Sequence, residues 1–184
     1  MSKPVYVWGF PGVGKTSLTS RTLTIVDADC TQFQFLPPDI PNSALHSTSN
    51  REGLLRQIYY PNNYLRYLAE QTADLVLINC HPSLLSGFDP ERLLLVYPEQ
   101  PLKDVYLRRY LDRGDHPSFI RQMDEAFDSM LDYLAHLPFR AYRITEPDTT
   151  LQTLLDGGIL SMGFTDLASG QKCYKLPPAF RDLL

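Results

Sequence analysis

Short runs of apolar residues alternate along the chain with segments whose apolar residues recur at helical spacing. The runs predict five buried strands, at 4–9, 23–27, 74–79, 92–97 and 139–145. Helical spacing is clearest over 117–137, and further helices are expected at 15–21, 61–72, 102–114 and 149–158, with a shorter one within 51–60. Strands that alternate with helices are typical of an α/β domain with a parallel sheet, which binds ligands at the carboxyl ends of its strands.

The periodic pattern breaks in two places. Three prolines within 37–41 interrupt it between residues 28 and 60, where regular structure is not expected. The last residues, 158–184, carry glycines and prolines without a clear period. We therefore expect one main domain over 1–157 and a C-terminal tail over 158–184.

Composition narrows the class of protein only slightly. The chain has 184 residues, 43% of them hydrophobic, and a net charge of −4, which gives no reason to expect binding to nucleic acid or to a membrane. Cys30, Cys80 and Cys173 lie far apart and form neither a disulfide framework nor a zinc motif. Without a signal peptide pattern or a long apolar run, the expected location is the cytoplasm.

The most specific motif follows the first strand. The stretch "GFPGVGKT" fits the phosphate-binding pattern G-x-x-x-x-G-K-[ST] without a gap. Its glycines let backbone N–H groups converge on phosphates, Lys15 is expected to reach the β- and γ-phosphates, and Thr16 to hold Mg²⁺. The predicted nucleotide-binding residues are Gly9, Phe10, Pro11, Gly12, Val13, Gly14, Lys15, Thr16 and Ser17.

Other strand ends bring polar residues to the same edge of the sheet. Asp27 and Asp29 end the second strand, and a carboxylate there can support Mg²⁺ or accept the proton of a hydroxyl group. Each is also explained as a turn acid or a helix cap. The third strand ends in Asn79, Cys80 and His81, where many nucleotide hydrolases carry an aspartate. His81 is interpreted as a contact to the acceptor or as a half-buried, hydrogen-bonded histidine.

An arginine cluster follows the fourth strand. Arg109 and Arg113 share one face of the predicted helix at 102–114. Such a cluster suits a lid, over about 103–118, that closes on a phosphoryl group during its transfer. The alternative is a solvated basic face.

These residues carry a family resemblance. The loop "GFPGVGKT", the "DAD" at the second strand end and the "RRYLDRG" of the lid resemble the adenylate kinase and shikimate kinase branch of P-loop kinases. The segments "DAD", "PNNY" and "YPEQPLKDVYLRRYLDRGD" resemble, more closely, bacteriophage-encoded P-loop proteins described as nucleoside or nucleotide kinases. The resemblance covers roughly residues 1–157.

The resemblance implies a three-layer P-loop NTPase fold with a five-stranded parallel sheet in the order 2-3-1-4-5. It implies a kinase that uses ATP and Mg²⁺, with the acceptor, a nucleoside or (deoxy)nucleoside monophosphate, held by about 30–66. A phage-encoded kinase would work in the host cytoplasm. The catalytic residues would be Lys15, Asp29, Arg109 and Arg113. Thr16 and Asp27 would bind the metal ion. The acceptor would contact Asp29, Tyr60, Asn62, Asn63, Tyr64 and His81.

Two other functions stay open at this stage. One is a catalytically silent nucleotide-binding module that senses nucleotide or recruits a partner through its tail. The other is a kinase that acts on a modified base within DNA, which the net charge of −4 disfavours. A homodimer also stays open, because nothing in the sequence fixes the oligomeric state.

Overall fold

The computed structural model describes residues 4–36, 55–56, 58–158 and 160. Its centre is a five-stranded parallel sheet in the order β2-β5-β1-β6-β7, which confirms the expected α/β class and the strand order 2-3-1-4-5. The strands are β1 (Val5–Gly9), β2 (Ile25–Ala28), β5 (Leu75–Ile78), β6 (Leu93–Pro98) and β7 (Arg140–Ile144). Each expected apolar run therefore forms a strand, with small shifts at the ends.

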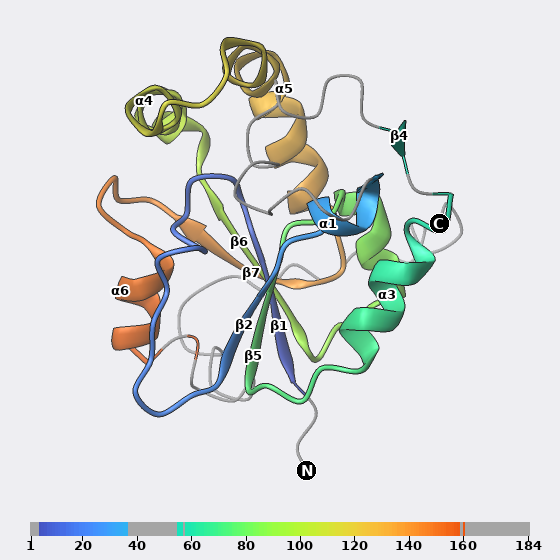
Figure 1. Ribbon diagram of the computed structural model, residues 1–184. Helices are drawn as coiled ribbons and strands as arrows, with labels where there is room; N and C mark the ends of the chain where they lie inside the picture. Colours follow the sequence, from blue (N-terminus) through green and yellow to red (C-terminus); the bar gives the residue numbers. More distant parts are fainter. Residues whose placement is uncertain (1–3, 37–54, 57, 159, 161–184) are drawn as a thin grey trace.

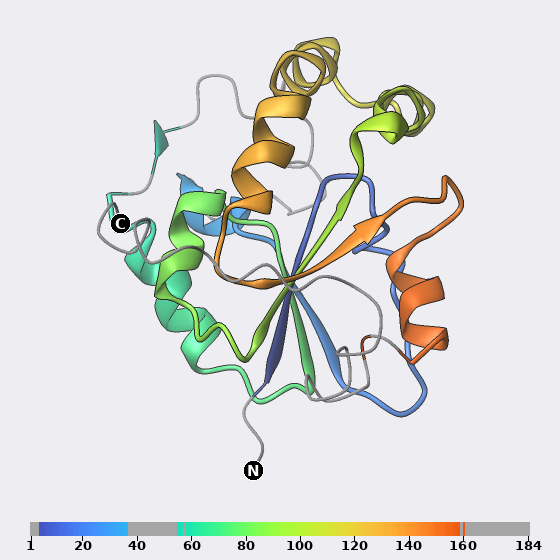
Figure 2. The same cartoon turned by 180° about the vertical axis from the view of Figure 1, so that it is seen from behind.

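Helices cover both faces of this sheet. Figures 1 and 2 show α3 (Asn62–Ala69) and α5 (Pro117–Ala135) on one side and α6 (Leu151–Asp156) on the other. The helix α4 (Lys103–Arg113) lies beyond the carboxyl ends of the strands, beside the loop that follows β1 (Figure 1). Short helical turns, η2 (Pro82–Gly87) and η3 (Gln100–Leu102), complete the connections. The carboxyl edge of the sheet is thus bounded by α4 and by the loops after β1, β2 and β5.

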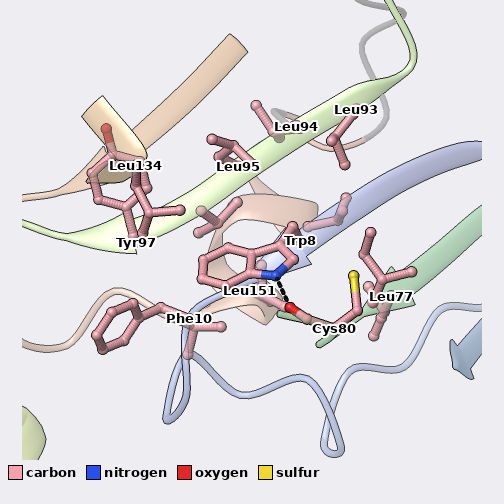
Figure 3. Close-up of a cluster of buried hydrophobic side chains, with 14 of the residues drawn as sticks. Trp8, Phe10, Leu77, Cys80, Leu93, Leu94, Leu95, Tyr97, Leu134 and Leu151 are labelled. Atoms are coloured by element: carbon pink, nitrogen blue, oxygen red, sulfur yellow. Dashed lines mark hydrogen bonds between the residues drawn. The ribbon is translucent and has the colours of Figure 1, made fainter. Parts of the chain in front are cut away.

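The core lies on the central strands. Every residue of β5 and β6 is buried, as expected for strands with helices on both faces. Trp8 of β1 is buried with them, and its Nε1–H donates to the carbonyl of Cys80 at 2.8 Å (Figure 3). Phe10 is fully buried next to this bond and meets Phe127 of α5 edge to face, with ring centroids 5.4 Å apart. The core therefore extends to Phe10, the second residue of the phosphate motif.

The expected helix at 15–21 is wrong. Residues 15–17 form turns, residues 18–20 have no regular structure, and β2 begins at Ile25. The segment is rich in Ser and Thr, whose side chains compete with helical hydrogen bonds; Ser17 Oγ donates to the Gly14 carbonyl at 3.2 Å, and Ser20 Oγ accepts the Leu23 N–H at 3.1 Å. The segment between the loop, which ends at residue 17, and β2, which begins at Ile25, is also too short for a longer helix that would offset this competition.

The region around 28–60 also differs from expectation. A short helix, α1 (Thr31–Gln34), follows β2, and β3 (Phe35–Leu36) pairs antiparallel with β4 (Leu55–Arg56). The expected helix within 51–60 is wrong for its described part, because β4 is extended and residues 58–60 form a turn. The prolines at 37–41 and the tail, apart from residues 158 and 160, lie outside the described residues.

The long helix α5 begins at a histidine cap. His116 is the N-cap, and its Nδ1 accepts the N–H of Ser118 at 3.3 Å and contacts the Ser118 hydroxyl at 2.7 Å. The preceding helix ends as predicted at Gly114, whose φ of 78° is left-handed. The turn between α4 and α5 is therefore fixed on both sides by local hydrogen bonding.

We predict that His116→Ala lowers the free energy of unfolding by about 1 kcal/mol, because an orphan N–H at the start of α5 loses its side-chain acceptor. Urea unfolding measures the change. His116→Asp is the matched control and should retain wild-type stability, since aspartate supplies an acceptor whose charge suits a helix N-terminus. Equal stability of the alanine and wild-type proteins would contradict this cap.

Candidate functional site

The loop over 10–17 lies at the carboxyl edge of the sheet, between β1 and the turns that precede β2 (Figure 1). The backbone carbonyls of residues 9–13 all accept hydrogen bonds from the protein. Their donors are Lys15 Nζ for Gly9 and Phe10, Tyr110 Oη for Pro11, Arg109 Nη1 for Gly12 and the Leu151 N–H for Val13. Carbonyl oxygens that are bonded in this way do not repel an anion in the loop.

The N–H groups of the same loop have the opposite status. Those of Gly12 and of residues 14–17 have no acceptor within the described part of the chain. Gly12 and Gly14 have φ angles of 84° and 91°, in the left-handed region that favours glycine. A run of unbonded N–H groups with left-handed residues among them is an arrangement that binds anions. The dipole of a following helix, which the sequence predicted, does not contribute here, because residues 15–17 form turns.

Lys15 folds back over this loop. Its ammonium group donates to the Gly9 carbonyl and, at 3.2 Å, to the Phe10 carbonyl. The side-chain stem lies against Gly9: a Cβ there would be 3.1 Å from Lys15 Cγ and 2.9 Å from Val13 Cγ2. Glycine at position 9 therefore leaves room for the lysine stem.

Burial and, to a smaller extent, the charge of Arg113 lower the pKa of Lys15 to about 8, although Asp27 and Asp29 oppose the shift. The ammonium group thus lies within the electrostatic reach of both predicted carboxylates and of one predicted arginine. The structure brings together the four charged groups of the loop, the second strand end and the lid.

The two carboxylates have different surroundings. Asp27 is exposed at the end of β2. Asp29 is only 8% exposed, and its Oδ1 accepts the Thr31 N–H at 2.8 Å and the Thr31 hydroxyl at 2.6 Å. Asp29 therefore fixes the turn into α1. Among the described residues, no three His, Cys, Asp or Glu side chains gather into a metal site.

The side chains that follow β5 form hydrogen bonds within the protein or are buried. Asn79 Oδ1 accepts the Cys30 N–H at 2.8 Å, which joins this strand end to that of β2. Burial raises the pKa of the Cys80 thiol to about 12, with a smaller contribution from Cys30, so that Cys80 stays protonated. His81 is exposed, not half-buried, and its Nδ1 caps η2 by accepting the Ser83 N–H at 3.3 Å.

The two predicted lid arginines make protein contacts. Arg109 donates to the carbonyls of Gly12, at 3.1 Å, and Pro147. Arg113 pairs with Asp115, its Nε lying 3.0 Å from each carboxylate oxygen. Arg109 therefore holds the loop, whereas Arg113 is half in solvent and paired with an acid on the turn between α4 and α5.

The residues predicted to contact the acceptor mostly join α3 to the segment after β2. Tyr64 is fully buried, and its hydroxyl donates to the Ala28 carbonyl at 2.6 Å. Asn63 Nδ2 donates to the Phe33 carbonyl at 3.1 Å, and Tyr60 Oη accepts from Gln34 at 3.1 Å. Asn62 is exposed. Tyr64 and Asn63 thus connect α3 to the segment after β2, while the side chain of Tyr60 is partly accessible.

Sequence analysis missed two tyrosines that contact the loop. Tyr106 and Tyr110 of α4 are fully buried, and their rings would lie 3.4 Å and 3.1 Å from a Cβ at Gly12. They are one helical turn apart and share a face, a spacing typical of core residues in general. Only their position beside a glycine-rich loop distinguishes them from core residues, and that position becomes known only from the three-dimensional structure.

Comparison with models of known protein families gave no match, and no curated protein matched the sequence. Within the described part of the chain, no helix has the length and apolar character needed to cross a membrane. The interpretation of the site therefore depends on its own geometry.

We predict that phosphate affinity depends on Lys15 titration. A bound anion favours the protonated amine, so affinity for pyrophosphate should fall above pH 8, by up to about tenfold per pH unit, until the raised pKa of the complex is reached. Stability should change in the opposite direction. The folded-state pKa lies below the ordinary value of 10.5, so the cost of burying the charge is present below pH 8 and is relieved between 8 and 10.5.

Calorimetric titration with pyrophosphate between pH 7.5 and 9.5 tests this linkage. Lys15→Arg supplies the comparison, because arginine stays charged throughout this range, and its residual affinity should not fall as the pH rises. A wild-type affinity that is constant to pH 9.5 would contradict the low pKa of Lys15.

Proposed function

We propose that this chain is a phosphotransferase with a P-loop NTPase fold, which moves the γ-phosphoryl group of ATP to a nucleoside or a (deoxy)nucleoside monophosphate. The observation that carries the proposal is the loop after β1. The carbonyls of residues 9–13 are bonded to the protein, the N–H groups of Gly12 and residues 14–17 have no acceptor within the described residues, and Lys15 lies across the loop. This arrangement supports binding of a chain of phosphates.

The carboxylates favour transfer over simple binding. Asp27 and Asp29 both act on the charge of Lys15, so they lie near the position that phosphates would occupy. Anionic side chains so close to an anion site weaken binding unless a metal ion or a proton transfer uses them. A kinase uses both.

The reaction is a displacement at phosphorus. The attacking oxygen, a hydroxyl of a nucleoside or a phosphate oxygen of a nucleoside monophosphate, bonds to the γ-phosphorus as the bond to the β,γ-bridging oxygen breaks, and ADP leaves with that electron pair. When the attacking group is a hydroxyl, its proton passes to the Asp29 carboxylate. Lys15 and the loop N–H groups hold the donor phosphates. Arg113 releases Asp115 and then contacts the transferring phosphoryl group.

The residues present fit a magnesium ion. Thr16 and Asp27 are exposed and offer a hydroxyl and a carboxylate oxygen, the hard donors that Mg²⁺ prefers, with phosphate oxygens and water as its remaining ligands. Bound there, the ion would neutralise charge on the phosphates. No further protein ligand is required, because Mg²⁺ commonly keeps several waters.

One observation favours a silent nucleotide-binding module. The end of β5 carries Asn79, whose side-chain oxygen is bonded to the Cys30 N–H, in the place where an aspartate often supports Mg²⁺. In this alternative ATP binds but no acceptor is phosphorylated.

The central test is Lys15→Ala. It should abolish detectable ATP binding and ADP release without lowering the melting temperature, because the lysine interacts with phosphates and carries a buried charge that costs stability. Lys103→Ala is the matched control: it removes a lysine that pairs with Asp124 at 2.9 Å on the surface and should leave binding intact.

The assay measures ADP release from ATP and Mg²⁺ across a panel of nucleosides, (d)NMPs and small hydroxy acids. Turnover with a nucleoside or a nucleotide supports the kinase. Binding without turnover on any acceptor supports the silent module, and a wild-type protein that does not bind ATP would contradict both functions.

The carboxylates provide a second prediction. Asp29→Asn should keep ATP binding but lower transfer about 100-fold or more, as expected for a lost general base. The fold should persist, because the asparagine amide oxygen can still accept the Thr31 N–H. Asp27→Asn should instead raise the Mg²⁺ concentration needed for half-maximal rate. If both variants show the same loss at saturating Mg²⁺, the separate roles of these two residues are wrong.

A further inference from the structure

The phosphate loop of this chain lacks the support of a helix immediately after it. Residues 15–17 form turns and residues 18–20 are irregular, so no helical hydrogen bonds fix the backbone at Lys15 and Thr16. A loop with several unbonded N–H groups loses conformational entropy when it adopts one shape. Something else must therefore hold it.

The helix α4 supplies two hydrogen bonds to consecutive loop carbonyls. Tyr110 Oη donates to Pro11 at 3.0 Å, and Arg109 Nη1 donates to Gly12 at 3.1 Å. Burial raises the pKa of Tyr110, so its hydroxyl remains a donor at every physiological pH. Both bonds therefore satisfy a carbonyl of the loop with a donor from α4.

The same helix restricts the loop by packing. Tyr110 and Tyr106 lie against Gly12, which has a left-handed φ of 84°. Tyr106 also meets Phe10 edge to face, with ring centroids 5.9 Å apart, and carries the Arg109 guanidinium 4.6 Å from its ring centre. The loop is thus held by hydrogen bonds at two carbonyls and by aromatic rings at the glycine between them.

A second support comes from the start of α6. The Leu151 N–H donates to the Val13 carbonyl at 2.9 Å, and the Gln152 amide forms both backbone hydrogen bonds of Thr19, at 3.0 Å and 3.2 Å. Arg109 joins the two supports, because it also donates to the carbonyl of Pro147, ahead of α6.

We infer that Arg109 and Tyr110 are positioning residues, which hold the phosphate loop in its anion-binding shape in place of the helix that usually follows such a loop. The inference rests on the proposed function for the identity of the ligand, but the contacts themselves belong to the free protein. Arg109 then acts through the loop and does not contact the transferring phosphoryl group.

The test uses the full chain without ligand first. Tyr110→Phe and Arg109→Ala should each raise the hydrogen-exchange rate of a peptide over 9–18 about three- to tenfold, the factor that a single net hydrogen bond contributes. Each should also raise the pKa of Lys15 from about 8 towards 10.5, because a looser loop lets water reach the ammonium. The pH profile of Lys15 acetylation, read by mass spectrometry, measures this change. If Arg109 and Tyr110 only stabilised the fold, their substitution would not change the pH profile of Lys15 acetylation.

Two matched controls separate loop positioning from charge and from loss of a hydroxyl. Arg108→Ala removes the adjacent, exposed arginine of α4 and should change neither readout. Tyr106→Phe removes a buried hydroxyl that makes no hydrogen bond to the described loop, while it keeps the ring on Gly12, and should leave loop exchange unchanged.

Pyrophosphate binding completes the experiment. Weaker binding in the Tyr110 and Arg109 variants, with faster loop exchange, supports positioning. Wild-type loop exchange and a wild-type Lys15 profile in both variants would overturn the inference, even if catalysis falls, because Arg109 would then act directly. If the wild-type protein binds neither pyrophosphate nor ATP, the proposed function fails, while exchange and acetylation still decide whether α4 holds the loop.

Discussion

The backbone of the loop after β1 must satisfy two opposite demands, and the rest of the site follows from how it does so. Its carbonyl groups need donors, and its N–H groups must be left for a ligand. Lys15 meets the first demand for the Gly9 and Phe10 carbonyls, and the next three carbonyls are met by side chains from α4 and by a backbone N–H from α6, which follow them by 97 or more positions along the chain. The binding shape is therefore a tertiary property, which exists only when the sheet and these helices are assembled.

This arrangement gives α4 two tasks. Arg109 and Tyr110 support the loop, and Arg113, one turn later, lies close enough to influence Lys15 and pairs with Asp115 on the next turn. A movement of α4 that frees Arg113 would also strain the contacts to the loop. In the proposed function, donor binding and lid closure would thus be mechanically linked, whereas a loop backed by its own helix would keep them separate.

The sequence predicted the sheet well because buried parallel strands are continuous apolar runs, and the short runs "LVLI" and "LLLVY" are typical of such strands. It failed at 15–21, where the similarity to helix-backed loops suggested a helix that Ser and Thr side chains do not support. The motif itself identified Gly9, Gly14 and Lys15, since their spacing is local. The contacts of Arg109 with Gly12 and Pro147 span 97 and 38 positions, and no local pattern encodes them.

The single tryptophan of the chain occupies an informative position. Trp8 is buried two positions before the loop begins, and its indole is bonded to the carbonyl of Cys80 at the neighbouring strand end (Figure 3). Its fluorescence therefore comes from one environment, shielded from water and covalently continuous with the loop. The protein thus carries a built-in optical reporter, so that unfolding can be followed by emission without a label.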